Sequence, residues 1–281
     1  MRWTPGDRSN IEDMRGRSGG MAMGAGGLGV GGLVLLLVLS WATGIDLTSI
    51  VGGGGSAPPE SVGTTGEVKA TPAEEKVVDM VDAVMDDAQD TWRKLLGGQY
   101  QDTKVVLFRE AINSACGFAQ SATGPFYCPS DRKVYLDLGF FDDLDRKLGA
   151  PGDFAQAYVL AHELGHHVQT LTGVERQVRE RQASNPGARN ALSVRMELQA
   201  DCFAGVWGHH ANSGGGRVQL DPDDAEEGLN AAASIGDDRL QRMQSGRVAP
   251  DRFTHGTSQQ RVEWFRRGMS GGDPKACNTF Q

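Results

Sequence analysis

Three residues near the middle of the chain have the spacing of a metal site. His162 and His166 are separated by three residues, and Glu163 follows the first histidine directly, which gives the pattern H-E-x-x-H. On a helix, residues i and i+4 lie on one face, so both imidazoles can bind one zinc ion. Glu163 lies about 100° round the helix axis from His162, a position that suits a general base. The alternative is a pair of surface histidines, which the apolar residues around the motif disfavour.

A third metal ligand is expected from a second helix. The longer pattern H-E-x-x-H-x-x-G-x-x-H fails here, because Gln169 and Thr172 occupy its later positions. Glu197 and Asp201 are again four residues apart, and they lie among apolar residues in MELQADCFAG. A buried carboxylate needs a partner such as a cation, so we expect Glu197 to bind the metal. Asp201 would accept a hydrogen bond from the far nitrogen of a ligand histidine. A solvated helix face is the alternative.

The reaction that this arrangement predicts is the hydrolysis of a peptide bond. Glu163 would take a proton from zinc-bound water as the water attacks the carbonyl, and would pass that proton to the leaving amine. His255, beside a glycine and just before a helix, is the candidate donor to the oxyanion, and Arg261 and Tyr135 are weaker candidates. The remaining histidines are expected to be structural or exposed: His167, His209 and His210.

Two other classes of function remain possible from these residues. One is a zinc-binding envelope protein without peptidase activity, such as an adaptor or a chaperone. The other is a cell-envelope interaction module that carries the motif by chance. Neither class needs Glu163, so its position beside both histidines favours an enzyme.

Longer segments of the chain resemble a known family. They are the RWTPGDRSNIEDMRG start, the glycine-rich stretch after it, and GPFYCPSDRKVYLDLGFF, GAPGDFAQAYVLAHELGHHVQ, ELQADCFAGVW and HGTSQQRVEWFRRG. Over nearly the whole chain they are similar to the bacterial neutral zinc metallopeptidase family. The resemblance implies a zincin-like domain of the gluzincin kind, a zinc metalloendopeptidase with Zn²⁺ as cofactor. The two histidines and the glutamate that it implies as ligands fall on His162, His166 and Glu197. Its catalytic acid and base falls on Glu163.

The composition of the chain excludes few classes of protein. With 281 residues, the chain is long enough for one sizeable core or two small ones. Its 39% of hydrophobic and 23% of charged residues are ordinary for a globular protein. The net charge of -8 argues against a nucleic-acid partner, because phosphate binding needs a basic face. The expected partner is a peptide or protein substrate in the cell envelope.

The start of the chain predicts a membrane anchor. Residues 1–20 are polar and contain four arginines, whereas residues 21–44 carry no charge and end in a run of leucines and valines. About 20 apolar residues can cross a bilayer as a helix. The arginines before the segment predict a single-pass protein of the cell membrane, with a cytoplasmic N-terminus and the remaining chain outside the cytoplasm. A cleaved signal peptide and a buried core helix are the alternatives; the apolar run is long for a signal peptide.

The elements that position the candidate residues predict an α+β domain, mainly helical, with a small sheet. Residues 45–71 read as a flexible linker rich in glycine and proline, so the domain should span 72–281. Helical spacings predict helices over 72–97, 188–209 and 258–269, the last with Ser258 as a possible cap. The helix that carries the motif is expected between Asp153 as N-cap and Gly173 as C-cap. Strands are expected at 104–110 and 133–141. The second strand is a candidate edge for an extended substrate.

Four cysteines agree with a domain outside the cytoplasm, where disulfides form. Four cysteines allow three pairings. Cys116 and Cys128 enclose a short segment rich in glycine and serine that can turn back on itself, so we expect them to pair. Cys202 and Cys277 would then pair by elimination. A zinc site made of the four cysteines is disfavoured, because no C-x-x-C pair exists.

Overall fold

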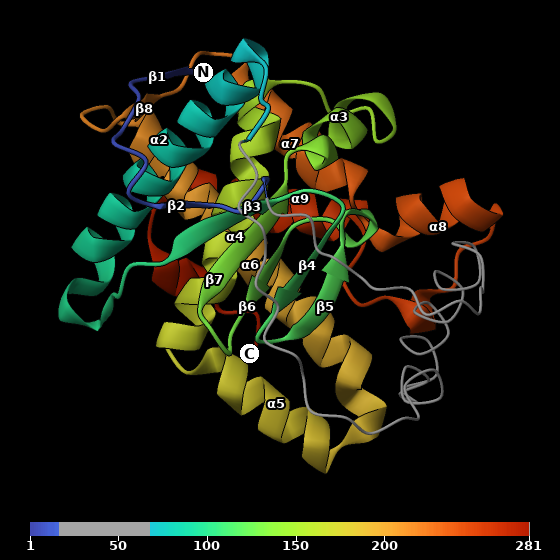
Figure 1. Ribbon diagram of the computed structural model, residues 1–281. Helices are drawn as coiled ribbons and strands as arrows, with labels where there is room; N and C mark the ends of the chain where they lie inside the picture. Colours follow the sequence, from blue (N-terminus) through green and yellow to red (C-terminus); the bar gives the residue numbers. More distant parts are fainter. Residues whose placement is uncertain (17–67, 281) are drawn as a thin grey trace, which may run out of the picture. The chain divides into compact units, whose positions relative to one another are not determined.

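The computed structural model describes residues 1–16 and 68–280 (Figure 1). The predicted anchor at 21–44 and most of the predicted linker at 45–71 lie outside the described residues. Among the residues that are described, no helix is long and apolar enough to cross a bilayer.

The described part is mainly helical with small sheets, as predicted for an α+β protein. Its helices are α2 (Pro72–Leu96), α3 (Gly139–Arg146), α4 (Asp153–Leu171), α5 (Val174–Ser184), α6 (Arg189–Asn212), α7 (Asp224–Ser234), α8 (Asp237–Ser245) and α9 (Ser258–Gly271). Its strands are β1 (Arg2–Trp3), β2 (Ile11–Asp13), β3 (Lys104–Phe108), β4 (Ala111–Ser114), β5 (Gly117–Gln120), β6 (Phe126–Cys128), β7 (Lys133–Asp137) and β8 (Val218–Gln219).

The main sheet has the strand order β2-β3-β7-β6. β3 runs parallel to β2 and to β7, whereas β6 runs antiparallel to β7. The prediction that the strand at 133–141 forms a substrate edge is therefore wrong, because β7 lies between β3 and β6. The strand is also shorter than predicted: the Asp137 carboxylate accepts the backbone N–H of Gly139 at 2.9 Å, and the chain turns there into α3. The edge strand on this side is β6.

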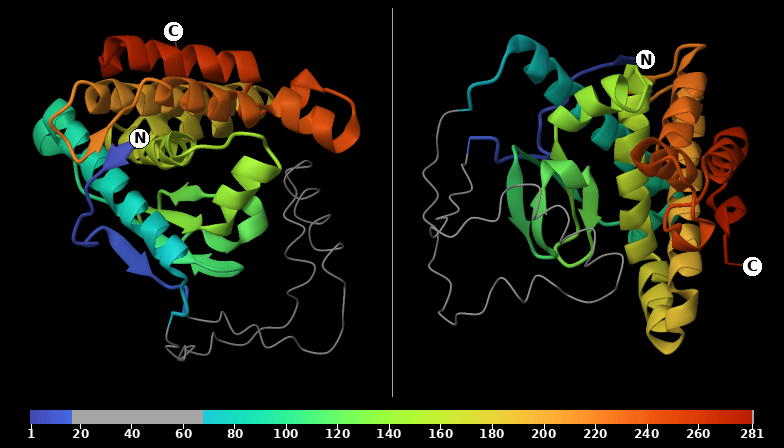
Figure 2. Two further views of the ribbon diagram at one scale, coloured as in Figure 1. Left: turned by 90° about the horizontal axis from the view of Figure 1, so that it is seen from above. Right: turned by 90° about the vertical axis from the view of Figure 1, so that its right-hand side faces the viewer.

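The motif helix α4 lies between two layers. Figure 2 shows the main sheet on one side of α4, and α6 and α9 on the other. Because both sides of α4 are covered, its apolar residues are buried all round; Phe154, for example, stacks on Trp207 of α6 at 5.7 Å between ring centroids. Gly165 allows the close approach of α4 to α6, since a Cβ there would lie 3.0 Å from the Ala200 Cα. This packing fixes the direction in which the motif side chains point.

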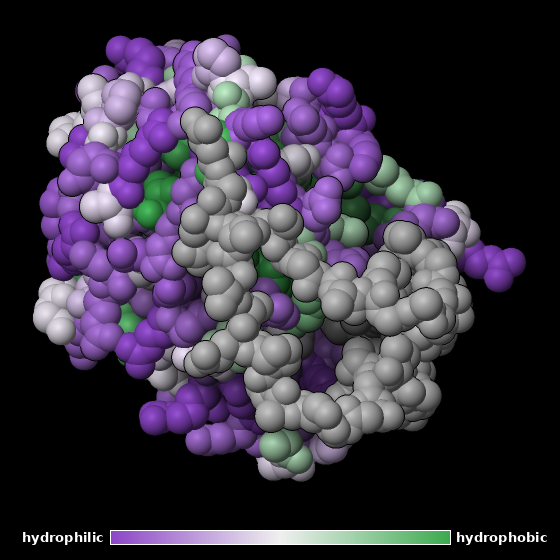
Figure 3. Space-filling view, in the orientation of Figure 1, coloured by the Kyte–Doolittle hydropathy of each residue, from purple (hydrophilic) through white to green (hydrophobic). Residues whose placement is uncertain are grey.

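Few large apolar side chains remain outside the core. Among the described residues, those that are exposed are Phe118, Met243 and Val248. The described residues on the face seen in Figure 3 are mostly hydrophilic, and hydrophobic residues appear there as small separate patches. The apolar surface of the helices and the sheet is thus used for internal packing.

The four predicted helices correspond to α2, α4, α6 and α9, and each begins within a residue of its expected position. Their caps differ in detail. Gly152 is the N-cap of α4 and Asp153 is its first residue, whereas Thr257 caps α9 in place of Ser258. Thr172 is the C-cap of α4 in place of Gly173, which has a φ of 78° and turns the chain into α5.

Both predicted disulfides are present. Cys116 is bonded to Cys128, and Cys202 of α6 is bonded to Cys277. The first bond ties the segment that holds β4 and β5 to the end of β6. The second ties the C-terminal segment to α6, the helix that carries Glu197.

The start of the chain belongs to the same compact unit as residues 68–280, which corrects the predicted separate segment at 1–20. β2 pairs with β3, and β1 pairs with β8. The guanidinium of Arg15 is buried against Glu74 and Glu75 at 2.9 Å each, and Arg8 binds Glu75 and Asp79 at 2.6 Å each. These contacts make Met1–Gly16 part of the folded domain.

This docking has a consequence for the predicted membrane topology. A chain that crosses a bilayer once between residues 16 and 68 would separate Met1–Gly16 from α2 and β3. The contacts described above place the two parts against each other. The predicted topology, with a cytoplasmic segment 1–20 and the remaining chain outside the cytoplasm, would place them on opposite sides of a bilayer, and it stays a prediction from the sequence.

Replacement of Arg15 tests the docking of the N-terminal segment. We expect Arg15→Ala to lower the free energy of unfolding of the full chain by about 1–3 kcal/mol, because the change removes charge-assisted hydrogen bonds from a buried site. Denaturant unfolding measures this change. Arg146→Ala, at an exposed position of α3, is the control and should change stability by less than about 0.5 kcal/mol. Equal stability of the two variants would contradict the docking.

Candidate metal centre

Three potential metal ligands converge where α4 crosses α6. The Nε2 atom of His162 lies 3.2 Å from one carboxylate oxygen of Glu197, and the Nε2 atom of His166 lies 3.6 Å from the other. One atom of each residue lies within 4.8 Å of the other two. The structure thus brings together the two histidines and the glutamate that the sequence selected, although they lie up to 35 positions apart.

The second nitrogen of His162 is held by Asp201, as predicted. Its Nδ1 atom lies 2.8 Å from the Asp201 carboxylate, which is fully buried. The same carboxylate accepts two hydrogen bonds from Arg261 of α9, both at 2.8 Å, and one from the Tyr158 hydroxyl. Burial alone would raise the pKa of Asp201, but Arg261 and His162 lower it. Arg261 therefore supports Asp201, and its charge is already engaged by a carboxylate, which disfavours it as the oxyanion donor.

The second nitrogen of His166 is held by Gln169, a residue that the sequence analysis considered only as a failed ligand position. The Nδ1 atom of His166 lies 2.9 Å from the Gln169 side-chain oxygen. The amide nitrogen of Gln169 donates to the Met196 carbonyl at 2.7 Å and to the Gln199 side chain at 3.1 Å. The spacing of three residues from His166 on the same helix was the available signal.

Glu163 and all three potential ligands line one cleft of about 700 Å³. The Glu163 side chain is largely buried, with the residue 8% exposed. Burial raises the pKa of Glu163, and the neighbouring histidines His166 and His162 oppose part of this rise. A carboxyl group whose pKa is moved toward neutrality is well suited to exchange protons with a substrate.

Comparison with known proteins agrees with this site. A family model described as "Putative neutral zinc metallopeptidase" matches residues 1–280. The chain belongs to this family. It is 50% identical over 291 aligned positions to YpfJ of Escherichia coli K12, with 100% of this chain and 99% of that protein covered. It is 43% identical over 199 positions to Mb2605 of Mycobacterium bovis, with 67% of this chain and 66% of that protein covered. No solved structure matches the chain.

Family membership implies Zn²⁺ as the cofactor, and the residues of this metallopeptidase fit that ion. Asp201 and Gln169 present acceptor oxygens to the two Nδ1 atoms, so each Nδ1 donates a hydrogen bond and each Nε2 is directed to the Glu197 side. Two imidazoles and one carboxylate are the ligand set of several catalytic zinc sites, which keep a fourth position for water. A second group of carboxylates also lies close enough together to hold a cation: Asp153, Asp224 and Glu227. The Met1 amino group already binds Asp153 and Asp224, so these two carboxylates have a positive partner within the chain.

His162 lies beside two carboxylates, those of Asp201 and Glu197. Burial lowers the pKa of this imidazole, but the Asp201 hydrogen bond and charge, together with Glu197, outweigh that effect and raise the pKa to about 10. A zinc ligand has to be the neutral imidazole.

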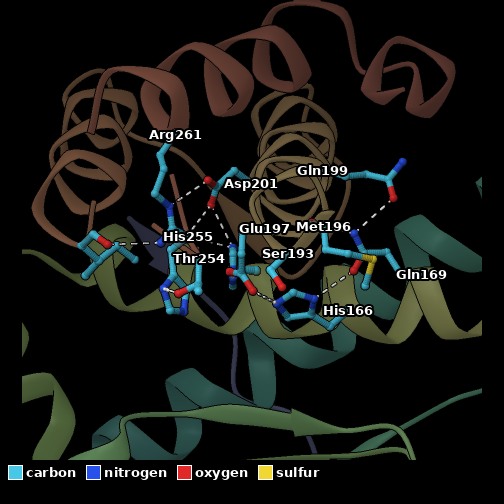
Figure 4. A network of polar contacts seen from close by, with 12 residues as sticks. His166, Gln169, Ser193, Met196, Glu197, Gln199, Asp201, Thr254, His255 and Arg261 are labelled. Atoms are coloured by element: carbon cyan, nitrogen blue, oxygen red, sulfur yellow. Dashed lines mark hydrogen bonds and ion pairs between the residues drawn. The ribbon is translucent and has the colours of Figure 1, made fainter. Parts of the chain in front are cut away.

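His255 also lines the cleft, as its predicted role requires. It lies in the loop before α9, and its side chain is 42% exposed. Its Nδ1 atom lies 3.2 Å from the carboxylate of Asp237 and 3.0 Å from the Thr254 hydroxyl, and Asp237 also accepts the backbone N–H of His255 at 2.6 Å. Burial would lower the pKa of His255, whereas the negative charges of Glu197 and Asp237 raise it above its usual value. Figure 4 shows His255 near Glu197, whose charge acts on its ring.

The other candidate residues lie elsewhere in the fold. Tyr135 is buried, stacks on Phe126 and donates to Asp131, and its own side chain does not line the cleft. His167 is buried: its Nε2 donates to the Gln101 carbonyl at 2.6 Å, and its Nδ1 accepts from the Tyr127 hydroxyl at 3.0 Å. The remaining histidines fit the prediction that they are structural or exposed, since His209 and His210 bind the carbonyls of Met269 and Gly272.

Proposed function

We propose that the protein is a zinc metalloendopeptidase of the zincin type, with His162, His166 and Glu197 as the zinc ligands. The observation that carries the proposal is the convergence of the three ligand atoms beside the buried carboxyl group of Glu163 in one open cleft. When bound there, zinc supplies a Lewis acid that activates water and polarises a peptide carbonyl. The ligand set and Glu163 together are the parts that peptide-bond hydrolysis needs.

The protein's own residues then move the protons. Glu163 acts as the general base that accepts a proton from the attacking water, and it returns the proton to the leaving amine. His255 donates a hydrogen bond to the oxygen on which negative charge develops, and Asp237 holds its ring in place through Nδ1. Asp201 and Arg261 keep the His162 ring in the orientation and tautomer that the metal requires.

The cleft suggests how an extended peptide would be held. Phe126 and Tyr127 of the edge strand β6 line one wall, close to Glu163. An edge strand offers unpaired backbone groups to which a peptide can add as a further strand. We therefore assign the substrate edge to β6 in place of β7, and a peptide or protein as the substrate. The membrane anchor and the envelope location of the substrate remain predictions from the sequence.

The metal content of the full chain tests the ligand set. We expect about one zinc per chain in the wild type and a strong loss in Glu197→Ala, because a site with only two protein ligands holds zinc poorly. Elemental analysis after dialysis measures the content. Glu226→Ala, at an exposed position of α7, is the control and should keep its zinc. No zinc in the folded wild type would end the proposal, whereas zinc without peptide cleavage would leave the alternative of a zinc-binding protein that is not a peptidase.

His255 has a test of its own. Phe at this position keeps an aromatic ring but has no hydrogen to donate, so we expect His255→Phe to lower kcat with little change in KM. Steady-state kinetics on a peptide that the wild type cleaves provide the measurement. An unchanged kcat would remove His255 from the mechanism and would leave the metal centre intact.

A further inference from the structure

A continuous row of hydrogen bonds joins the C-terminal segment to His166, a proposed zinc ligand. From His166, the row passes to Gln169 at 2.9 Å and from Gln169 to Gln199 at 3.1 Å (Figure 4). From Gln199 it passes to the Cys277 carbonyl at 3.0 Å. It connects α4, α6 and the chain after α9, which lie far apart in the sequence. Neither of the two glutamines lines the cleft.

The direction of this row is fixed by its far end. The Cys277 carbonyl can only accept, so Gln199 turns its NH₂ group toward Cys277 and its oxygen toward Gln169. Gln169 therefore turns its own NH₂ group toward Gln199, and its oxygen faces His166. Gln169 is fully buried and Gln199 is 6% exposed, so neither amide has water as an easy substitute partner.

The orientation of Gln169 decides which nitrogen of His166 carries the proton. An acceptor oxygen beside Nδ1 keeps the proton on Nδ1 and leaves the Nε2 lone pair free for a metal. A reversed amide would place NH₂ beside Nδ1, and the proton of the neutral ring would move to Nε2, on the Glu197 side. The second donor bond of Gln169, to the Met196 carbonyl at 2.7 Å, favours the same orientation.

The far end of the row is itself held rigidly. Cys277 is fully buried and is bonded to Cys202 of α6, five positions after the ligand Glu197. The next residues are tied as well, since the Thr279 hydroxyl donates to the Arg195 carbonyl at 2.7 Å. We propose that Gln169 and Gln199 are positioning residues for the zinc ligand His166, and that the disulfide-anchored C-terminal segment is a structural part of the zinc site. The proposal rests on the metal centre proposed above but not on peptidase activity.

Zinc affinity measured by competition with a chromogenic chelator tests the proposal on the full chain. We expect Gln169→Ala to bind zinc about 10- to 100-fold more weakly than the wild type, the usual effect of removing the partner of a ligand histidine. Gln199→Leu, which does not contact His166, should weaken zinc binding by a smaller factor. Gln177→Ala, at an exposed position of α5, is the matched control and should bind zinc as the wild type does.

A second readout separates positioning from a general loss of structure. The tautomer of His166 can be read from the imidazole nitrogen shifts of the metal-free protein at a pH where the ring is neutral. We expect the Nδ1–H form in the wild type and a mixture of tautomers in Gln169→Ala and, to a lesser degree, in Gln199→Leu. Wild-type affinity and tautomer in both variants would overturn this inference alone. A wild-type protein that binds no zinc would overturn the proposed function as well.

Discussion

Replacement of Glu163 by glutamine is expected to lower kcat/KM for peptide cleavage by about 10²- to 10⁴-fold, the range for loss of a general acid and base. Glutamine has nearly the same shape as glutamate but cannot take a proton from water or return one to the leaving amine. Glu163 lines the cleft but is not one of the three converging ligands, so Glu163→Gln should keep its zinc. Peptide-library digestion followed by kinetics on one cleaved peptide provides the measurement.

Glu226→Gln is the control for this variant, since it makes the same chemical change at an exposed position of α7. It should cleave peptides at the wild-type rate. Wild-type activity in Glu163→Gln would exclude Glu163 as the base even if zinc is present. Loss of zinc together with loss of activity would instead indicate that Glu163 contributes to metal binding.

Replacement of Arg261 by methionine should have the largest effect on stability. The change keeps much of the apolar volume but leaves the fully buried Asp201 carboxylate without its guanidinium partner. Loss of one partner of a buried ion pair costs about 3–5 kcal/mol, because a charge stays buried without compensation. Denaturant unfolding of the full chain measures the loss. Arg266→Met, at an exposed position of the same helix, should stay within about 0.5 kcal/mol of the wild type.

The pH dependence of stability provides a further check on this ion pair. The folded-state pKa of Asp201 is lowered, so its ionised form stabilises the folded protein above the unfolded pKa, and this contribution disappears as the pH falls toward the folded pKa. In Arg261→Met we expect the pKa of Asp201 to rise. The decrease in the free energy of unfolding that this group causes at low pH should then become smaller or change sign. A variant with the stability and the pH profile of the wild type would show that Arg261 is not the partner that holds Asp201.

The long helices of the fold were predictable from the sequence, whereas most strands were not. The apolar spacing of α2, α4, α6 and α9 extends over several turns, and such periodicity is a strong local signal. Of the strands, β6 has three residues and β1 and β8 have two each, too few for an alternating pattern. Their pairing depends on residues far away in the chain, which no local window contains.

The role of the first residues shows the same limit most clearly. Residues 1–20 read as a polar segment, because four arginines among polar residues and glycines give no sign of burial. The burial of Arg15 arises from Glu74 and Glu75, about 60 positions away. Only the folded chain shows that the segment belongs to the domain, because the contacts that bury it join parts far apart in the sequence.

For the metal centre, the sequence by itself determined which residues are the candidate ligands and the candidate base, because the spacing of four residues on a helix fixes which side chains share a face. This applies to His162 and His166 on α4 and to Glu197 and Asp201 on α6. Only the tertiary structure decided how these partners are held, since Gln169 donates to Met196 and Gln199 of α6, and Asp201 accepts from Arg261 of α9. Spacing along one helix is a local property, whereas the angle and distance between two helices depend on the packing of the whole core.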